Sequence, residues 1–141
     1  LPTRFIRIKQ FYKPSEQNEV VMKDSITLTA SDGHSFQAYF AAPVGMPTAA
    51  VVVVQEIFGV NAHIREVADR IATAGYLVIA PALFDRIAPD ITLAYDDDAI
   101  AEGRGLKDQA GANSVFDVKA AIDHVASAGA VGVVGFCWGG S

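Results

Sequence analysis

The only cysteine of the chain, Cys137, stands in the sequence Gly-Phe-Cys-Trp-Gly-Gly, directly after a short apolar run. Glycines at this spacing around a nucleophile are typical of a sharp strand-to-helix turn, where larger side chains would collide with the adjoining strand and helix. Serine is the usual central residue, but a thiolate is a stronger nucleophile and suits the same position. A lone cysteine is more often a small buried apolar residue. Here the glycines and the preceding run favour a catalytic nucleophile.

A carboxylate, Glu56, follows a second apolar run in the sequence Gln-Glu-Ile-Phe-Gly-Val-Asn. Residues at the carboxyl end of a buried parallel strand lie where open α/β sheets bind their ligands. In hydrolases of this plan, the loop after this strand also supplies a backbone N–H to the oxyanion hole. Glu56 is either an ordinary loop carboxylate or part of one site with Cys137, since the two segments would meet at the same sheet edge.

Other kinds of site find little support in the sequence. The glycines do not form the Gly-x-Gly-x-x-Gly of dinucleotide binding, and no Gly-Lys-Ser/Thr phosphate loop occurs. No spacing of His, Cys and Glu resembles a metal site, so we expect neither a metal nor a cofactor. Two histidines, His34 in a turn and His63 at a helix start, are expected to be polar surface residues, and His124 a half-exposed neighbour of the core.

The first half of the chain supplies the elements that would position Glu56. Two short strands, residues 26–29 and 36–40, flank an Asp-Gly turn and predict a hairpin. The β-branched run 49–54 predicts a strand covered on both faces. A helix then follows with Asn61 as its N-cap and Gly75 after its end.

On this helix, Arg65 and Asp69 lie one turn apart, which predicts an ion pair on the exposed side. Residues 76–80 form the next short apolar run and predict a strand. Residues 83–112 mix the run Asp96-Asp97-Asp98 with three glycines, and we expect a surface excursion with one short helix.

The second half supplies the elements that would position Cys137. Ser114 and Asp117 resemble a capping box at the start of a helix that Gly129 ends. The apolar stripe of that helix consists of Val115, Val118, Ile122 and Val125. Residues 131–134 predict the strand that enters the cysteine turn. A hairpin followed by alternating strands and helices is an α/β plan with a mostly parallel sheet.

The composition of the chain excludes several classes of protein. The chain has 141 residues, of which 51% are hydrophobic and 19% charged, and this excludes a disordered chain. A net charge of −5 argues against a nucleic-acid partner, and no apolar stretch is long enough to cross a membrane. One cysteine cannot form an internal disulfide, so the cytoplasm is the expected location.

Together these segments resemble the dienelactone hydrolase (carboxymethylenebutenolidase) family of the α/β-hydrolase fold. The resemblance rests on Gln-Glu-Ile-Phe-Gly-Val-Asn at 55–61 and Gly-Phe-Cys-Trp-Gly-Gly at 135–140, and it extends from the hairpin to the last residue. It implies a hydrolase that opens lactones or related esters through a cysteinyl acyl-enzyme on Cys137. The backbone N–H groups of Ile57 and Trp138 would form the oxyanion hole.

The resemblance also implies a role for Glu56 in activating the thiol. Its carboxylate would contact the resting thiol, keep it mostly protonated, and take its proton when a substrate carboxylate binds. In the family, an arginine of the middle segment helps to hold that substrate carboxylate. Arg104 is the nearest candidate, but the residues around it do not align well enough to carry this role over.

The domain organisation follows from the order of the catalytic residues. In this fold the acid and the histidine come after the nucleophile, so both are expected beyond Ser141. Because a single domain of this class needs about 200–250 residues, residues 25–141 are expected to be the N-terminal part of one domain, after an arm formed by residues 1–24. The chain's partner would then be the rest of its own domain. The alternative is a non-catalytic binding or interaction domain that keeps the hydrolase shape.

Overall fold

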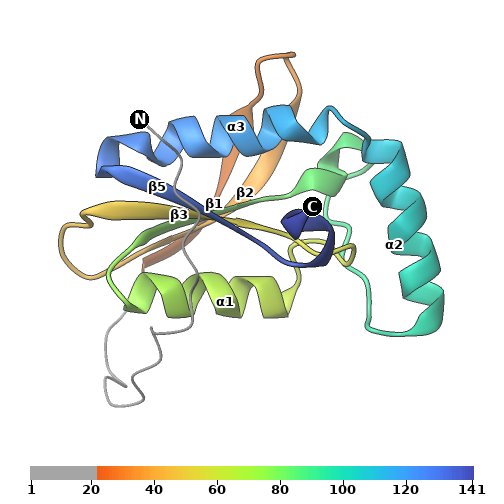
Figure 1. The fold of residues 1–141 in the computed structure, drawn as a ribbon, viewed down its shortest axis with the longest axis horizontal. Helices are drawn as coiled ribbons and strands as arrows, with labels where there is room; N and C mark the ends of the chain where they lie inside the picture. The colour runs from red at the N-terminus through yellow and green to blue at the C-terminus, as the bar shows by residue number, and fades with distance from the viewer. Residues whose placement is uncertain (1–21) are drawn as a thin grey trace.

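The computed structural model describes residues 22–141, which form a twisted sheet with helices on both faces (Figure 1). In chain order the elements are β1 (Met22–Thr29), β2 (Ser35–Ala42), β3 (Ala49–Val54), α1 (Ala62–Thr73), β4 (Leu77–Pro81), α2 (Asp97–Ala110), α3 (Ser114–Val125) and β5 (Ala130–Gly135). Three 3₁₀ turns are η1 (Leu83–Arg86), η2 (Ala126–Ala128) and η3 (Cys137–Gly140). Within residues 22–141 no helix is long and apolar enough to span a bilayer.

The sheet is mixed, with the strand order β1-β2-β4-β3-β5. The hairpin β1–β2 and the pair β2–β4 are antiparallel, whereas β4–β3 and β3–β5 are parallel. In the last pair the register runs from Ala49 beside Ala130 to Val54 beside Gly135. Since these two strands end side by side, the chain segments that leave them must start next to each other.

The hydrophobic core lies on both faces of β3. Val51 and Val53 pack with the buried side of α1, whereas Val52 and Val54 pack on the other face with the buried residues of α3. Figure 1 shows α1 and α3 on opposite sides of the sheet. The prediction of a strand at 49–54 covered on both faces is confirmed, with the same bounds.

The N-terminal hairpin is also confirmed, and its strands are longer than predicted. β1 begins at Met22, while the arm predicted for residues 1–24 falls mostly outside the described residues. Gly33 has φ +87°, a conformation that glycine adopts without strain, and its N–H donates to the Ala30 carbonyl at 2.9 Å. His34 is half-buried and stacks on Phe36, and its buried Nε2 atom has no hydrogen bond to any of residues 22–141, so the expected surface position is wrong.

The start of α1 matches its prediction, whereas the predicted ion pair on it is wrong. The Asn61 side chain accepts a hydrogen bond from the Ile64 N–H at 3.1 Å and caps the helix. Asp69 accepts hydrogen bonds from the Tyr39 hydroxyl and from Lys23, and Arg65 lies over the Tyr39 ring. The two side chains contact the hairpin rather than each other, because that face of the helix packs against β2.

Residues 83–112 are more ordered than the sequence indicates. They contain η1 and the 14-residue helix α2, instead of one short helix. The Asp96 side chain caps α2 by accepting the Ala99 N–H at 2.8 Å, and Asp97 and Asp98 occupy its first turn, where the helix dipole favours negative charge. Figure 1 places α2 beyond the end of the sheet that carries the C-terminus.

The predicted capping box on α3 is wrong. The residue that precedes the helix is Asn113, and the Ser114 hydroxyl donates to the Gly111 carbonyl. Asp117 is fully buried and accepts two hydrogen bonds from Arg86, at 2.9 and 2.7 Å. Burial raises the pKa of Asp117, although Arg86 acts in the opposite direction.

Arg86 also binds Asp32 in the hairpin turn, and this pairing lowers the pKa of Asp32. The guanidinium therefore ties the turn, η1 and α3 together. On α3, Val118, Ile122 and Val125 pack toward the core as predicted, whereas Val115 is exposed.

Candidate active site

Cys137 occupies a strained backbone position at the end of β5. Its φ is +52°, whereas Phe136 before it is extended, and the 3₁₀ turn η3 starts at the cysteine itself. A positive φ costs a residue with a Cβ about 1–2 kcal/mol. Such strain persists where the surroundings force it and is concentrated at functional sites. The side chain is not covered by any of residues 22–141, and the thiol is free.

Two glycines of the turn are required by close backbone contacts. A Cβ on Gly135 would lie 1.6 Å from the Gly139 carbonyl oxygen. A Cβ on Gly139 would lie 2.5 Å from the carbonyl oxygen of Val54 and 2.8 Å from that of Gln55. All three atoms belong to the backbone and cannot swing aside. The steric reason given for the glycines in the sequence therefore holds at both positions.

The cysteine turn lies directly against the end of β3. The Phe136 N–H donates to the Val54 carbonyl at 3.4 Å, in continuation of the β3–β5 register. Gly139 packs on the last carbonyls of the same strand. The two segments singled out in the sequence therefore meet at one end of the sheet, as expected for the carboxyl ends of neighbouring parallel strands.

Trp138 joins the cysteine turn to the Glu56 loop through its side chain. Its indole stacks on Phe84 with ring centres 5.6 Å apart, and it packs on the cluster of Ile57, Phe58 and Ala99. Ile57 and Trp138, the two residues expected to supply oxyanion-hole N–H groups, therefore belong to one packed cluster. Trp138 is in the first turn of η3, where N–H groups have no partner inside the helix.

The Ile57 backbone is enclosed by neighbouring segments. Its N–H makes no hydrogen bond with any of residues 22–141, which leaves a donor available. Its carbonyl oxygen faces α2 so closely that a Cβ on Gly103 would lie 2.2 Å from it. In the same loop Gly59 has φ +82°, and a Cβ on it would lie 2.2 Å from the Ile91 carbonyl oxygen. The loop therefore has little room to move.

Glu56 is held by a tyrosine that sequence reasoning missed. The Tyr95 hydroxyl donates to Glu56 Oε2 at 2.9 Å and accepts from Asn61 Nδ2 at 3.0 Å. Burial raises the pKa of Tyr95, and the contact with Glu56 adds to this, although the hydrogen bond from Asn61 acts in the opposite direction. The Cys137 thiol makes no hydrogen bond within residues 22–141. The structure therefore places Glu56 with Tyr95, and its predicted action on the thiol stays a prediction.

A second residue that sequence reasoning missed is Gln55, which is fully buried. Its side-chain oxygen accepts the Leu83 N–H at 2.9 Å, and its nitrogen donates to the Glu56 carbonyl at 3.1 Å. The amide thus connects the end of β3 with the segment that follows β4. A polar residue directly after four valines was the only available signal in the sequence.

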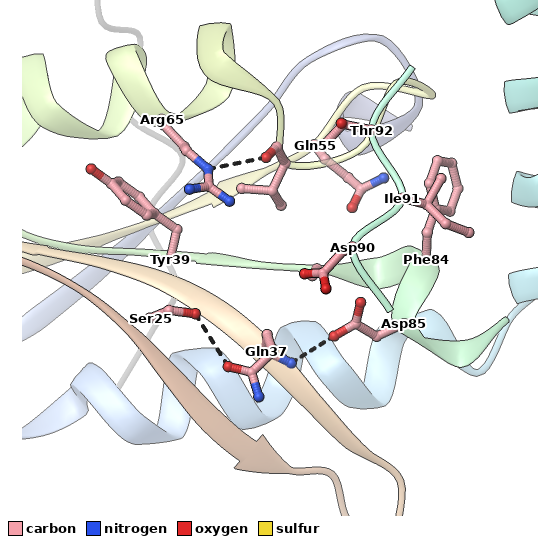
Figure 2. Close-up of a pocket in the computed structure, with 12 residues that line it drawn as sticks. Ser25, Gln37, Tyr39, Gln55, Arg65, Phe84, Asp85, Asp90, Ile91 and Thr92 are labelled. Carbon is pink, nitrogen blue, oxygen red and sulfur yellow. Dashed lines mark hydrogen bonds between the residues drawn. The ribbon is translucent and has the colours of Figure 1, made fainter. Parts of the chain in front are cut away.

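A pocket of about 50 Å³ lies beside the Glu56 loop (Figure 2). Figure 2 shows Arg65 and Tyr39 on one side of it and Asp85 and Asp90 on the other. Burial raises the pKa of Asp85, although the Gln37 N–H donates to its carboxylate at 2.7 Å and acts the other way. No residue of the cysteine turn lines this pocket, whereas Gln55, directly before Glu56, does.

The remaining sequence candidates lie away from Cys137 or are exposed. His63 is exposed in the first turn of α1 and contacts Phe136 edge-on, whereas His124 is exposed on α3 beside Phe40. Arg104 is an exposed residue of α2. Among residues 22–141 no group of three His, Cys, Asp or Glu side chains could hold a metal ion.

Comparison with known proteins shows which family this chain resembles. A model of the dienelactone hydrolase family matches residues 36–141. The chain is 38% identical over 128 residues to a putative carboxymethylenebutenolidase of Synechocystis sp., with 86% of this chain and 52% of the relative covered. It is 35% identical over 130 residues to a carboxymethylenebutenolidase of Pseudomonas putida, with 86% and 54% covered.

The fold has matching solved structures as well. A putative dienelactone hydrolase from Klebsiella pneumoniae superposes with a TM-score of 0.62 at 32% identity, covering 86% of this chain and 52% of that one. The chain spans about half the length of the curated relatives it matches. The resemblance inferred from the two sequence motifs is confirmed, and so is the α/β-hydrolase fold.

Proposed function

Because this chain belongs to the dienelactone hydrolase family, we propose that the full-length protein hydrolyses lactones or related esters through a covalent intermediate on Cys137. The observation that carries the proposal is the cysteine turn itself: an exposed thiol at φ +52°, between glycines that close contacts require, next to the end of β3. The substrate is a small ester or lactone, with or without a carboxylate, and the reaction needs no metal or cofactor. The lone thiol suits a reducing cytoplasm, which we propose as the location.

In the proposed reaction the thiolate of Cys137 attacks the carbonyl carbon of the substrate and forms a C–S bond. The carbonyl oxygen takes the electron pair, and the N–H groups of Ile57 and Trp138 hydrogen-bond to this oxyanion. When the carbonyl reforms, the C–O bond to the alcohol part breaks and that oxygen takes up a proton. Water then attacks the thioester, which releases the acid and restores the thiol.

A thioester trapped on the protein would test this function directly. Mixing full-length protein with a molar equivalent of p-nitrophenyl acetate and quenching in acid should yield protein heavier by one acetyl group. Peptide mapping should place that group on Cys137. Hydrolysis without a trapped acyl group, or an acyl group on another residue, would contradict the mechanism. A protein that neither hydrolyses esters nor acylates would instead be a non-catalytic binding domain.

Glu56 is proposed to control the thiol, and this predicts a difference in alkylation rate. Its negative charge disfavours the thiolate, so Cys137 in the wild type should react slowly with iodoacetamide until a carboxylate such as maleate is bound. Glu56→Gln should react faster without maleate and respond less to it. Glu66→Gln serves as the control, because this exposed glutamate pairs with Arg70 on α1. Equal rates in wild type and Glu56→Gln, with and without maleate, would refute the control by Glu56.

A further inference from the structure

The side-chain amide of Gln55 is hydrogen-bonded to the loop that carries the proposed oxyanion hole. Resting on the proposed function, we infer that Gln55 is a positioning residue: its side-chain amide aims the backbone N–H of Ile57 at the substrate oxygen. The inference starts from burial, because no part of Gln55 is exposed and a buried amide is costly unless both of its ends are hydrogen-bonded.

Both ends of the Gln55 amide have partners in the backbone. Oε1 accepts the Leu83 N–H at 2.9 Å, and Nε2 donates to the Glu56 carbonyl at 3.1 Å. A backbone N–H can only meet the oxygen of the amide, and a carbonyl can only meet its nitrogen. The two partners therefore determine which way the amide is turned. Leu83 starts η1, just after β4, so the amide connects its own loop with the segment that follows the neighbouring strand.

The bond to the Glu56 carbonyl, together with the backbone bridge between Glu56 and Gly59, sets the direction of the Ile57 N–H. These two groups belong to the same peptide unit, which is planar and trans, so the N–H points away from the carbonyl oxygen. Holding the oxygen of Glu56 toward Gln55 leaves the Ile57 N–H pointing to the other side. That N–H makes no hydrogen bond within residues 22–141. This is expected of a donor that binds a ligand.

Gln55 belongs to the loop and to the pocket at the same time. Figure 2 shows its side chain among the residues lining the pocket. The position follows the buried run of β3, where a side chain of similar size without polar atoms would fill the space but leave the Leu83 N–H without this partner. The amide is therefore better explained by the two backbone groups that it orients than by packing.

Replacing Gln55 by methionine tests the inference, because this keeps the volume and removes both hydrogen bonds. The acylation rate of full-length protein by p-nitrophenyl acetate should fall about 10²-fold, since a misplaced oxyanion donor acts on the transition state. Alkylation of Cys137 by iodoacetamide is a displacement at carbon that forms no oxyanion, so its rate should stay within about threefold. In steady state, kcat should fall while KM changes little.

A second variant, Gln55→Glu, keeps the inference testable if the first fails to fold. A protonated glutamate has one donor and one acceptor and can replace the amide, whereas an ionised one cannot donate to the Glu56 carbonyl. Acylation by Gln55→Glu, expressed relative to wild type at each pH, should therefore rise as the pH falls. The corresponding ratio for Gln55→Met should not change with pH.

Three outcomes would overturn the inference. These are acylation by a folded Gln55→Met within about threefold of wild type, a parallel loss of acylation and alkylation, or a Gln55→Glu ratio that does not depend on pH. Each of them leaves acylation of the wild type on Cys137 intact and so leaves the proposed function standing. Absence of acylation in the wild type would overturn the proposed function, and this inference with it.

Discussion

Replacing Cys137 by alanine is expected to reduce kcat/KM of the full-length protein for an ester or lactone by about 10⁴- to 10⁶-fold. In enzymes with a catalytic triad, removing the nucleophile lowers kcat about as much as removing all three residues, because the triad acts as a unit. What remains would come from oxyanion binding and substrate positioning alone. The effect is measured from initial rates with p-nitrophenyl acetate, at enzyme concentrations high enough to detect the residual activity.

Alanine keeps the backbone strain of the cysteine turn, because it too has a Cβ at φ +52°. Cys137→Gly relieves this strain at the same position and is expected to be at least as stable to heat as Cys137→Ala, despite the larger entropy of glycine in the unfolded chain. Both variants should be inactive. An active Cys137→Ala would rule out the nucleophile, and a Cys137→Gly clearly less stable than Cys137→Ala would show that the turn is not strained.

A second large effect is expected from Gly103 in α2, far from Cys137 in the sequence. A Cβ at this position would lie 2.2 Å from the Ile57 carbonyl oxygen, so either the helix or the loop has to move in Gly103→Ala. Overpacking of this kind costs about 1–3 kcal/mol of stability. Displacing the loop that carries Ile57 should also lower kcat about 10²-fold, since errors of about 1 Å in positioning have that cost.

The same helix offers a matched control two residues away. A Cβ on Gly105 would have no heavy atom within 4 Å, so Gly105→Ala should gain up to about 1 kcal/mol from helix propensity. Thermal unfolding and steady-state kinetics of the two variants, measured in parallel, separate the steric effect from the general effect of removing a glycine. If Gly103→Ala matched Gly105→Ala in stability and kcat, the close packing of α2 on the loop would have no functional weight.

The sequence alone predicted the parts of this protein that local patterns control. The valine run gave the bounds of β3, Asn61 gave the start of α1, and the spacing of glycines around Cys137 gave the strained turn. Each of these depends on residues within one turn or one strand of each other. Even the meeting of the two motif segments followed from the rule that neighbouring parallel strands end at the same edge of a sheet.

The tertiary structure alone decided which polar side chains pair across distant segments. Asp117, predicted as part of a capping box, is buried against Arg86, and Asp69 pairs with Tyr39 instead of Arg65. Tyr95 reaches Glu56 across 39 residues, and Gly103 makes room for the Ile57 carbonyl. Periodicity tells which face of an element is buried, but not what it is buried against. A hydrogen bond or a close backbone contact depends on the orientation of two segments, and only packing of the whole chain sets that orientation.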